Sequence, residues 1–208
     1  MCRRRICLRL IGHESSGNRG HCRDACAAEC CVLCPGDPAE AEAATKAIAE
    51  YPGTCYLRLG RGGEKRIHKD IENFKIGQAI RIHKGERIAV FSTGAILDEV
   101  VGAADILAKK GINPELCSFP TVKPIDRETI LRCAKDFEII AVVEEHNILG
   151  GFGSAVAEVL SELPAHARLL RIGLNDTYCS VVGSQKYLRM QFGLDANGIA
   201  KRISEAIG

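Results

Sequence analysis

The sequence contains no tryptophan, and aromatic residues make up only 5% of its 208 residues. Because proteins that bind single-stranded nucleic acid stack bases on aromatic side chains, this composition argues against such a module. No apolar run approaches the roughly 18 residues that a membrane-spanning helix requires. The formal net charge is only +2, so no long-range field indicates an anionic partner such as nucleic acid or a membrane surface.

The N-terminus also lacks the features of a secretory signal. Residues 1–20 include Arg3, Arg4 and Arg5, but they contain neither a continuous apolar segment nor a small-residue cleavage site. We therefore expect a cytoplasmic protein. The composition, 46% hydrophobic and 26% charged, is that of a folded globular chain, and its length suits one medium domain, with or without a fragment of another.

Cysteine is distributed unevenly, since six of the 11 cysteines fall in residues 1–31. Cys22, Cys26 and Cys30 repeat every four residues beside His21, and thiolate and imidazole ligands can bind zinc. The spacing differs from paired C-x-x-C motifs, and on a helix these thiols would form a stripe rather than a tetrahedral cage. Residues 1–31 also show no persistent apolar period, which suggests that two different kinds of sequence are joined.

Regular structure is predicted from Val32 onward. Asp37, Pro38 and Glu40 form a helix start, with an N-cap, a proline at the first helical position and a capping box. Residues 64–85 are polar with short β-like pieces and are predicted to be a linker. We predict strands at 32–35, 55–61, 87–93, 115–119, 138–145 and 168–174, and helices at 38–51, 96–107, 127–136, 154–163, 184–192 and 196–207.

The later strands are apolar throughout instead of alternating, as in strands that are covered on both faces. From Glu86 onward four such strands alternate with helices, which predicts a mostly parallel sheet with helices on both faces. A partial α/β unit precedes this domain. The predicted fold class is therefore α/β.

The glycine-rich turn at residues 150–154 lies between a predicted strand and a predicted helix, where backbone N–H groups can bind phosphate. The dinucleotide pattern G-x-G-x-x-G, started at Gly151, would need glycine at Val156, so it is incomplete. The alternative is structural: Gly150, Gly151 and Gly153 allow a tight turn and a close approach of another chain, with Ser154 opening the helix.

Glu144, Glu145 and His146 end a predicted buried strand, at the sheet edge where ligands often bind. Burial can shift such groups toward neutrality, so acid–base chemistry is conceivable. No nucleophile or third partner accompanies them, which favours hydrogen bonding across a loop or a subunit contact.

Arg58 and Arg61 flank the end of another predicted strand, just before Gly62 and Gly63. A guanidinium in this place can hold a phosphate through two parallel hydrogen bonds. It can equally be a solvated strand end, and the sequence leaves both interpretations open.

A family resemblance depends on a series of segments that occur in order. They are residues 92–94, 121–126, 143–147, 150–154, 183–184 and 193–195, together with Tyr178. These segments resemble the C-terminal domain shared by transketolases, deoxyxylulose-phosphate synthases and thiamine-dependent 2-oxo-acid dehydrogenases. The tract from Glu144 to Ser154 is most similar to transketolase-like members, including those made as separate N- and C-terminal subunits.

The resemblance implies a division of the chain. Residues 86–208 are expected to be the transketolase C-terminal domain, and residues 64–85 the linker. Residues 32–63 resemble the last strand–helix–strand unit of the preceding pyrimidine-binding domain. In family members an arginine at the position of Arg61 contacts the substrate phosphate.

In the family, thiamine diphosphate and its divalent metal ion lie between two earlier domains, and the glutamate that activates the cofactor belongs to a part that is absent here. The resemblance therefore implies the C-terminal part of an enzyme that transfers two-carbon ketol units between sugar phosphates and is inactive alone. Expected partners are a second copy or an N-terminal transketolase section. The alternatives are a non-catalytic dimerisation domain, or a fragment of a deoxyxylulose-phosphate synthase or 2-oxo-acid dehydrogenase.

Upstream of Val32 the resemblance stops abruptly. Reading the codons of His13 to Cys31 one nucleotide forward can yield the string MSHPEIEDIAVMRALPNV, which resembles what the family has just before its VLCPGD segment. Residues 1–31 are therefore expected to be translated out of frame and not to be native family sequence.

Overall fold

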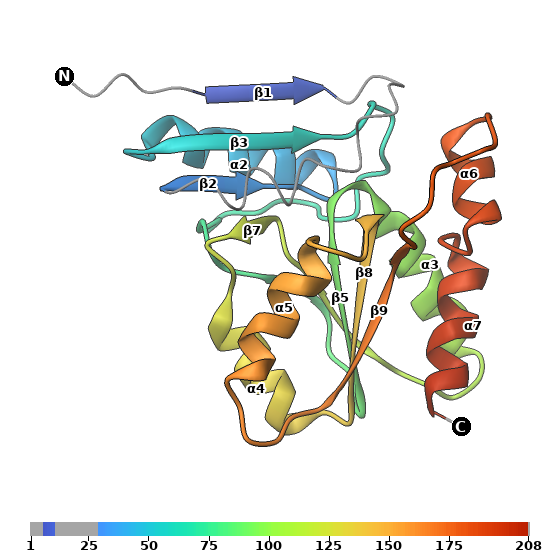
Figure 1. Ribbon diagram of the computed structural model, residues 1–208. Helices are drawn as coiled ribbons and strands as arrows, with labels where there is room; N and C mark the ends of the chain where they lie inside the picture. The colour runs from blue at the N-terminus through green and yellow to red at the C-terminus, as the bar shows by residue number, and fades with distance from the viewer. Residues whose placement is uncertain (1–5, 11–28, 208) are drawn as a thin grey trace.

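The structure, a computed structural model, describes residues 6–10 and 29–207. These residues form two sheets with helices packed against them (Figure 1). The strands are β1 Ile6–Leu10, β2 Cys30–Leu33, β3 Thr54–Leu59, β4 Ile80–His83, β5 Ile88–Thr93, β6 Glu115–Ser118, β7 Thr121–Lys123, β8 Ile139–Asn147 and β9 Arg168–Leu174. The helices are α2 Pro38–Glu50, α3 Leu97–Ala108, α4 Arg127–Asp136, α5 Phe152–Ser161, α6 Gln185–Gln191 and α7 Ala196–Ile207.

The first sheet has the strand order β1-β3-β2-β7, in which β1, β3 and β2 are parallel and β7 is antiparallel to β2. Helix α2 packs on it, because Ala44 and Ile48 share an apolar cluster with Leu33 and Leu57. The predicted N-cap and the proline in the first turn are confirmed, since Asp37 accepts a hydrogen bond from the backbone N–H of Glu40. The capping box differs from the prediction, because the Glu40 carboxylate accepts from the N–H of Gly36 and not from that of Asp37.

The second sheet has the order β4-β6-β5-β8-β9, and every pairing except β4 with β6 is parallel. Successive residues of β5 point to opposite faces: Phe91 packs in the cluster of α4 and α5, and Val90 in the cluster of α3 and α7. The two helix pairs lie on opposite sides of this sheet (Figure 1). The predicted fold class, a mostly parallel sheet covered on both faces, is confirmed.

Three strands lie where the sequence predicts none. Strand β7 falls within the predicted loop 121–126, where its first residues are buried against β2. Strand β4 falls within the predicted linker and shows the alternating burial of an edge strand. Strand β1 lies within residues 1–31 and pairs with β3. All three are edge strands of at most five residues, which are too short to show a clear period in the sequence.

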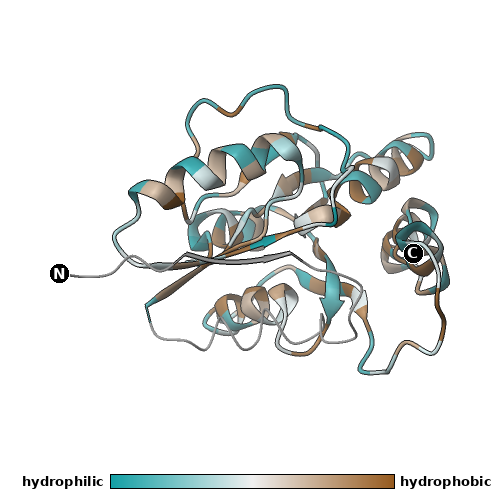
Figure 2. Ribbon diagram, turned by 90° about the horizontal axis from the view of Figure 1, so that it is seen from above, coloured by the Kyte–Doolittle hydropathy of each residue, from teal (hydrophilic) through white to brown (hydrophobic). Residues whose placement is uncertain are grey.

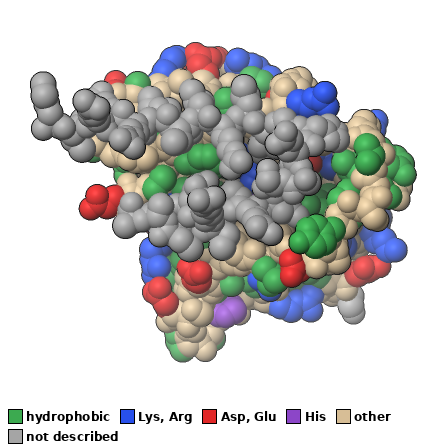
Figure 3. All heavy atoms as spheres, turned by 45° about the horizontal axis from the view of Figure 1, so that its top comes forward, with side chains coloured by type: hydrophobic (Ala, Val, Ile, Leu, Met, Phe, Trp, Pro, Cys, Tyr) green, Lys and Arg blue, Asp and Glu red, His purple; other side chains and the backbone are tan. Residues whose placement is uncertain are grey.

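The helices carry hydrophilic and hydrophobic residues along their length (Figure 2), as expected for helices that cover a sheet. Among the described residues, no helix combines the length and apolar character needed to cross a membrane. On the face seen in Figure 3, basic and acidic side chains of the described residues are interspersed, so this view shows no surface dominated by one charge.

Candidate functional site

The predicted cluster at the end of β8 separates onto the two faces of the strand. Glu144 and His146 are both 1% exposed and point to one face, whereas Glu145 is partly exposed on the other. The imidazole Nδ1 of His146 lies 3.9 Å from Glu144 Oε2 and 2.9 Å from the carbonyl oxygen of Asn147. The structure therefore brings together two of the three predicted groups.

The Glu144 carboxylate binds the N-terminus of α5. Its Oε2 accepts a hydrogen bond from the N–H of Phe152 at 2.7 Å, and its Oε1 accepts one from the N–H of Gly153 at 2.9 Å. These N–H groups belong to the first turn of the helix, where donors have no partner within the helix and the helix dipole favours a negative charge. The position that a phosphate would take in a nucleotide-binding loop is therefore filled by a side chain of the same protein.

Burial dominates the electrostatics of this pair. Burial raises the pKa of Glu144 from 4.5 to about 7, against the lowering effect of the two N–H groups and of Arg171 and Arg58. Burial also lowers the pKa of His146. Both shifts favour neutral groups, but the Glu144 oxygens are occupied by backbone donors, which favours the structural interpretation over acid–base chemistry on a substrate.

The glycines of the turn have two separate roles. Gly150 has φ of +69°, a backbone conformation that glycine adopts readily, so the predicted tight turn is confirmed. A Cβ atom at Gly151 would lie 2.1 Å from Glu144 Oε2, and one at Gly153 would lie 3.0 Å from Glu144 Oε1. The close approach that these two glycines permit is thus made by the Glu144 carboxylate. The predicted approach of another chain stays a prediction.

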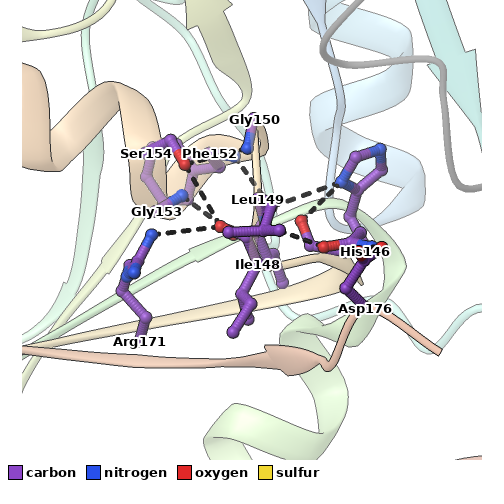
Figure 4. A network of polar contacts seen from close by, with 11 residues as sticks. His146, Ile148, Leu149, Gly150, Phe152, Gly153, Ser154, Arg171 and Asp176 are labelled. Atoms are coloured by element: carbon purple, nitrogen blue, oxygen red, sulfur yellow. Dashed lines mark hydrogen bonds and ion pairs between the residues drawn. The ribbon is translucent and has the colours of Figure 1, made fainter.

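The side chain of Ser154 stabilises the turn through hydrogen bonds to its backbone. Its hydroxyl accepts a hydrogen bond from the N–H of Gly150 at 3.0 Å and donates one to the carbonyl oxygen of Ile148 at 3.1 Å. Arg171 of β9 donates to the same carbonyl oxygen at 3.1 Å. In Figure 4, Arg171, Gly153 and Ser154 lie to the left of Leu149, and His146 and Asp176 lie to the right. The network links β8, the turn, α5 and β9.

Glu145 connects β8 to α6 instead. Its Oε2 lies 2.6 Å from Nη2 of Arg189, and both carboxylate oxygens accept hydrogen bonds from the side-chain amide of Gln185. The same Arg189 nitrogen donates to the carbonyl oxygen of Ala95. Glu145 therefore holds α6 to the end of β8, and Arg189 joins α6 to the turn that precedes α3.

The two arginines near the end of β3 differ in environment. Arg58 is partly buried, and its Nη1 is buried without a hydrogen-bond partner among the described residues. Its charge lowers the pKa of both Glu144 and His146, for which burial is the larger effect. Arg61 follows β3 and is exposed. The structure brings Arg58, and not Arg61, toward the end of β8.

Sequence reasoning missed a second polar cluster, at the start of α2. Asp37 and Glu40 are buried, and His68, which lies beyond β3 in the predicted linker, joins them. Asp37 Oδ2 accepts hydrogen bonds from the N–H groups of Ile67 at 2.8 Å and His68 at 2.7 Å. The capping motif identified the two carboxylates, but no local signal pointed to a histidine about 30 residues away.

Carboxylates of the chain itself occupy helix N-termini at which a diphosphate group could otherwise bind. The N-termini of α2, α4 and α5 each receive a carboxylate of the same chain, from Asp37, Asp126 and Glu144 respectively. These three helix starts are therefore closed to a phosphate anion. The described residues do not fit thiamine diphosphate at these positions. Of the cysteine and histidine cluster considered for zinc, His21, Cys22 and Cys26 lie outside the described residues, and Cys30 begins β2.

Comparison with protein families identifies the later part of the chain. Residues 77–199 match the family model described as "Transketolase, C-terminal domain". The chain is 38% identical over 176 residues to a Methanocaldococcus jannaschii protein provisionally named a transketolase C-terminal section, covering 84% of this chain and 54% of that protein. It is 36% identical over 168 residues to an apulose-4-phosphate transketolase subunit of Actinobacillus succinogenes, covering 81% of this chain and 54% of that protein. The chain thus spans about half the length of these relatives.

Solved structures show the same relationship. A structure titled "Split gene transketolase, inactive beta4 tetramer" superimposes with a TM-score of 0.85 at 27% identity, covering 97% of this chain and 65% of that one. A mutant transketolase from Pichia stipitis superimposes with a TM-score of 0.70 at 19% identity, covering 90% of this chain and 26% of the other. The second likeness shows the fold alone.

Proposed function

Because the chain belongs to the transketolase C-terminal-domain family, we propose that it is the C-terminal part of a thiamine-diphosphate-dependent enzyme that transfers two-carbon ketol units between sugar phosphates. The observation that carries this proposal is the superposition of 97% of the chain on a split-gene transketolase structure. Relatives that are themselves named as a section or a subunit support a division of labour between two chains.

The cofactor belongs, in this proposal, to an N-terminal section. Thiamine diphosphate, when bound there with a divalent metal ion, supplies the electron sink for the chemistry. The carboxylates at the starts of α2, α4 and α5 support this assignment, since they exclude a diphosphate group from three helix N-termini of this chain. The chain alone is therefore proposed to be inactive, and to work in the cytoplasm with an N-terminal section or as a homodimer within the complete assembly.

The proposed division keeps residues 86–208 as the C-terminal domain, residues 64–85 as the linker and residues 32–63 as the end of a pyrimidine-binding domain. Arg61 follows the last strand of that unit and is exposed, so its guanidinium is available to contact the phosphate of a sugar phosphate. Residues Glu144 to Ser154 would support the assembly by holding the end of β8 and the start of α5 in one rigid arrangement.

The test is to produce the chain with a candidate N-terminal section and measure ketol transfer between sugar phosphates. We expect transfer in the mixture and none from either chain alone. Arg61→Gln should raise the KM for the sugar phosphate roughly tenfold or more, because a charge-assisted hydrogen bond to phosphate is worth about 1.5–3 kcal/mol. Arg66→Gln is the matched control in the same segment and should leave KM unchanged.

If the two chains form a stable complex that shows no ketol transfer, two other functions remain to be tested. Relatives include 1-deoxy-D-xylulose-5-phosphate synthases, such as that of Syntrophotalea carbinolica at 32% identity over 174 residues, so synthase activity is the second assay. Absence of both activities would favour a non-catalytic domain that associates with itself.

A further inference from the structure

The cluster of Asp37, Glu40 and His68 has the dimensions of a cation site. The His68 Nδ1 atom lies 3.2 Å from Asp37 Oδ2 and 3.7 Å from Glu40 Oε1, and one candidate ligand atom of each residue lies within 4.8 Å of the others. Four ligands arranged tetrahedrally about a metal ion at about 2.1 Å are about 3.4 Å apart. These separations therefore suit an ion bound between the three side chains.

Two of the three side chains, Glu40 and His68, offer atoms without other partners, whereas Asp37 Oδ2 already accepts hydrogen bonds from two backbone N–H groups. The Glu40 side chain is fully buried, and its Oε1 makes no hydrogen bond of good geometry within the described residues, although the Ser118 hydroxyl lies beside the carboxylate. Among the residues that the structure describes, no group makes a hydrogen bond of good geometry with either ring nitrogen of His68. Because a buried polar atom without a partner is costly, a ligand between these groups would satisfy them.

Backbone donors hold Glu40 Oε2 and both oxygens of Asp37, including the Oδ2 that faces His68. Glu40 Oε2 accepts a hydrogen bond from the N–H of Gly36 at 2.6 Å, and Asp37 accepts from the N–H groups of Glu40, Ile67 and His68. Such outer contacts orient metal-binding carboxylates in known sites. They also mean that the two carboxylates are positioned before any ion binds.

We propose that Asp37, Glu40 and His68 form a binding site for a divalent transition-metal ion of the zinc class. One imidazole with two carboxylates is a ligand set that suits zinc and its neighbours, whereas magnesium and calcium prefer oxygen ligands alone. The fourth ligand would be water or the hydroxyl of Ser118, which lies beside the Glu40 carboxylate.

Metal binding would join two parts of the chain. His68 lies in the segment after Arg61, and Asp37 and Glu40 lie at the start of α2, so the ion would fix that segment against the first sheet. The proposal of a metal site does not depend on the proposed function.

The experiment uses the full chain after treatment with a chelator, titrated with Co²⁺ as a coloured substitute for Zn²⁺. We expect one Co²⁺ per chain with weak visible absorption bands, displaced by Zn²⁺ and not by Mg²⁺. The bands should lack the intense near-ultraviolet absorption that thiolate ligands produce, which distinguishes this site from the 11 cysteines. His68→Gln and Glu40→Gln should each weaken binding at least tenfold, as loss of a ligand does.

His166→Gln is the matched control, because His166 is exposed and distant in sequence, and it should bind as the unchanged protein does. Circular dichroism shows whether Glu40→Gln is folded, and His68→Gln, in a partly buried segment, gives an independent result. Undiminished binding by His68→Gln, or absorption typical of thiolate ligands, would overturn the proposal. So would a failure of the unchanged chain to bind Co²⁺.

Discussion

Helices α2 and α5 begin in the same way, with a carboxylate bound to their N-terminal N–H groups, but the pKa values of the two carboxylates shift in opposite directions. For Asp37, burial raises the pKa, yet three backbone N–H donors outweigh it and the net pKa is lowered. For Glu144, burial raises the pKa to about 7 against only two such donors. The balance between the number of N–H donors and the depth of burial decides whether the pKa of the carboxylate is lowered or raised.

The difference follows from where each carboxylate comes from. Asp37 is part of a local capping motif and also binds the segment at Ile67 and His68. Glu144 reaches its helix from the preceding strand, eight residues before the first N–H that it binds. A local cap is identifiable in the sequence and stays charged, whereas the cap supplied by β8 lies between two sheets and is protonated more readily.

The largest effect is expected from Glu144→Ala. The change leaves the N–H groups of Phe152 and Gly153 buried without an acceptor, and each such loss costs about 1–3 kcal/mol. We expect the free energy of unfolding, measured by chemical denaturation, to fall by about 3–5 kcal/mol. Glu145→Ala is the control on the same strand: its contacts are partly exposed, so the loss should be about 1 kcal/mol or less. Equal losses would show that Glu144 is not the main support of α5.

The second prediction concerns pH. Because the pKa of Glu144 is raised from 4.5 to about 7 on folding, the folded chain binds a proton that the unfolded chain has lost. The free energy of unfolding should therefore fall as pH rises through this window, by up to about 3 kcal/mol, and the loss should be complete above about pH 7.

His146 acts in the opposite direction, since its lowered pKa makes stability rise as pH increases through its titration range. The measurement is therefore the difference between the unchanged protein and Glu144→Gln, determined at several pH values. This difference should shrink as pH rises from about 4.5 to 7. A difference that does not vary with pH would contradict the raised pKa.

A smaller effect is expected from Asp37→Ala, about 2 kcal/mol, because N-cap substitutions cost about 0.5–2 kcal/mol and the donors of Ile67 and His68 are only partly buried. The contribution of Asp37 to stability should change with pH in a more acidic range than that of Glu144. Because folding lowers the pKa of Asp37, this carboxylate stabilises the folded state at pH values above its ordinary pKa of 3.8. The stabilisation is lost as the pH falls through the pKa that Asp37 has in the folded state. Asp37→Asn keeps an acceptor oxygen and should cost less. A loss confined to the range between pH 4.5 and 7 would overturn this comparison.

The sequence predicted those features that depend on local patterns. The apolar runs of β5 and β8 predicted a sheet covered on both faces, and the capping motif predicted the start of α2. Strand β7 was predicted as a loop, because three residues with a register shift carry no period of their own.

The sequence predicted which residues belong to the candidate site, but it did not predict the contacts between them. Alternation along β8 separates Glu144 from Glu145, yet nothing local reveals that the Glu144 carboxylate fills the turn in which Gly151 lies. His68 was not identified, since its partners at the start of α2 are about 30 residues earlier in the chain.

The origin of residues 1–31 is a separate question, which the DNA answers. We expect the bases that encode His13 to Cys31 to contain, in the frame one nucleotide forward, the family-like string described above. A gene without such a shifted reading frame would contradict the proposal that this segment is not native.

The most direct test of the account is calorimetric titration of thiamine diphosphate and a divalent metal ion into the chain, alone and together with an N-terminal section. We predict no saturable binding by the chain alone, because carboxylates occupy the starts of α2, α4 and α5, and saturable binding by the mixture. Saturable binding of thiamine diphosphate by the chain alone would contradict the account.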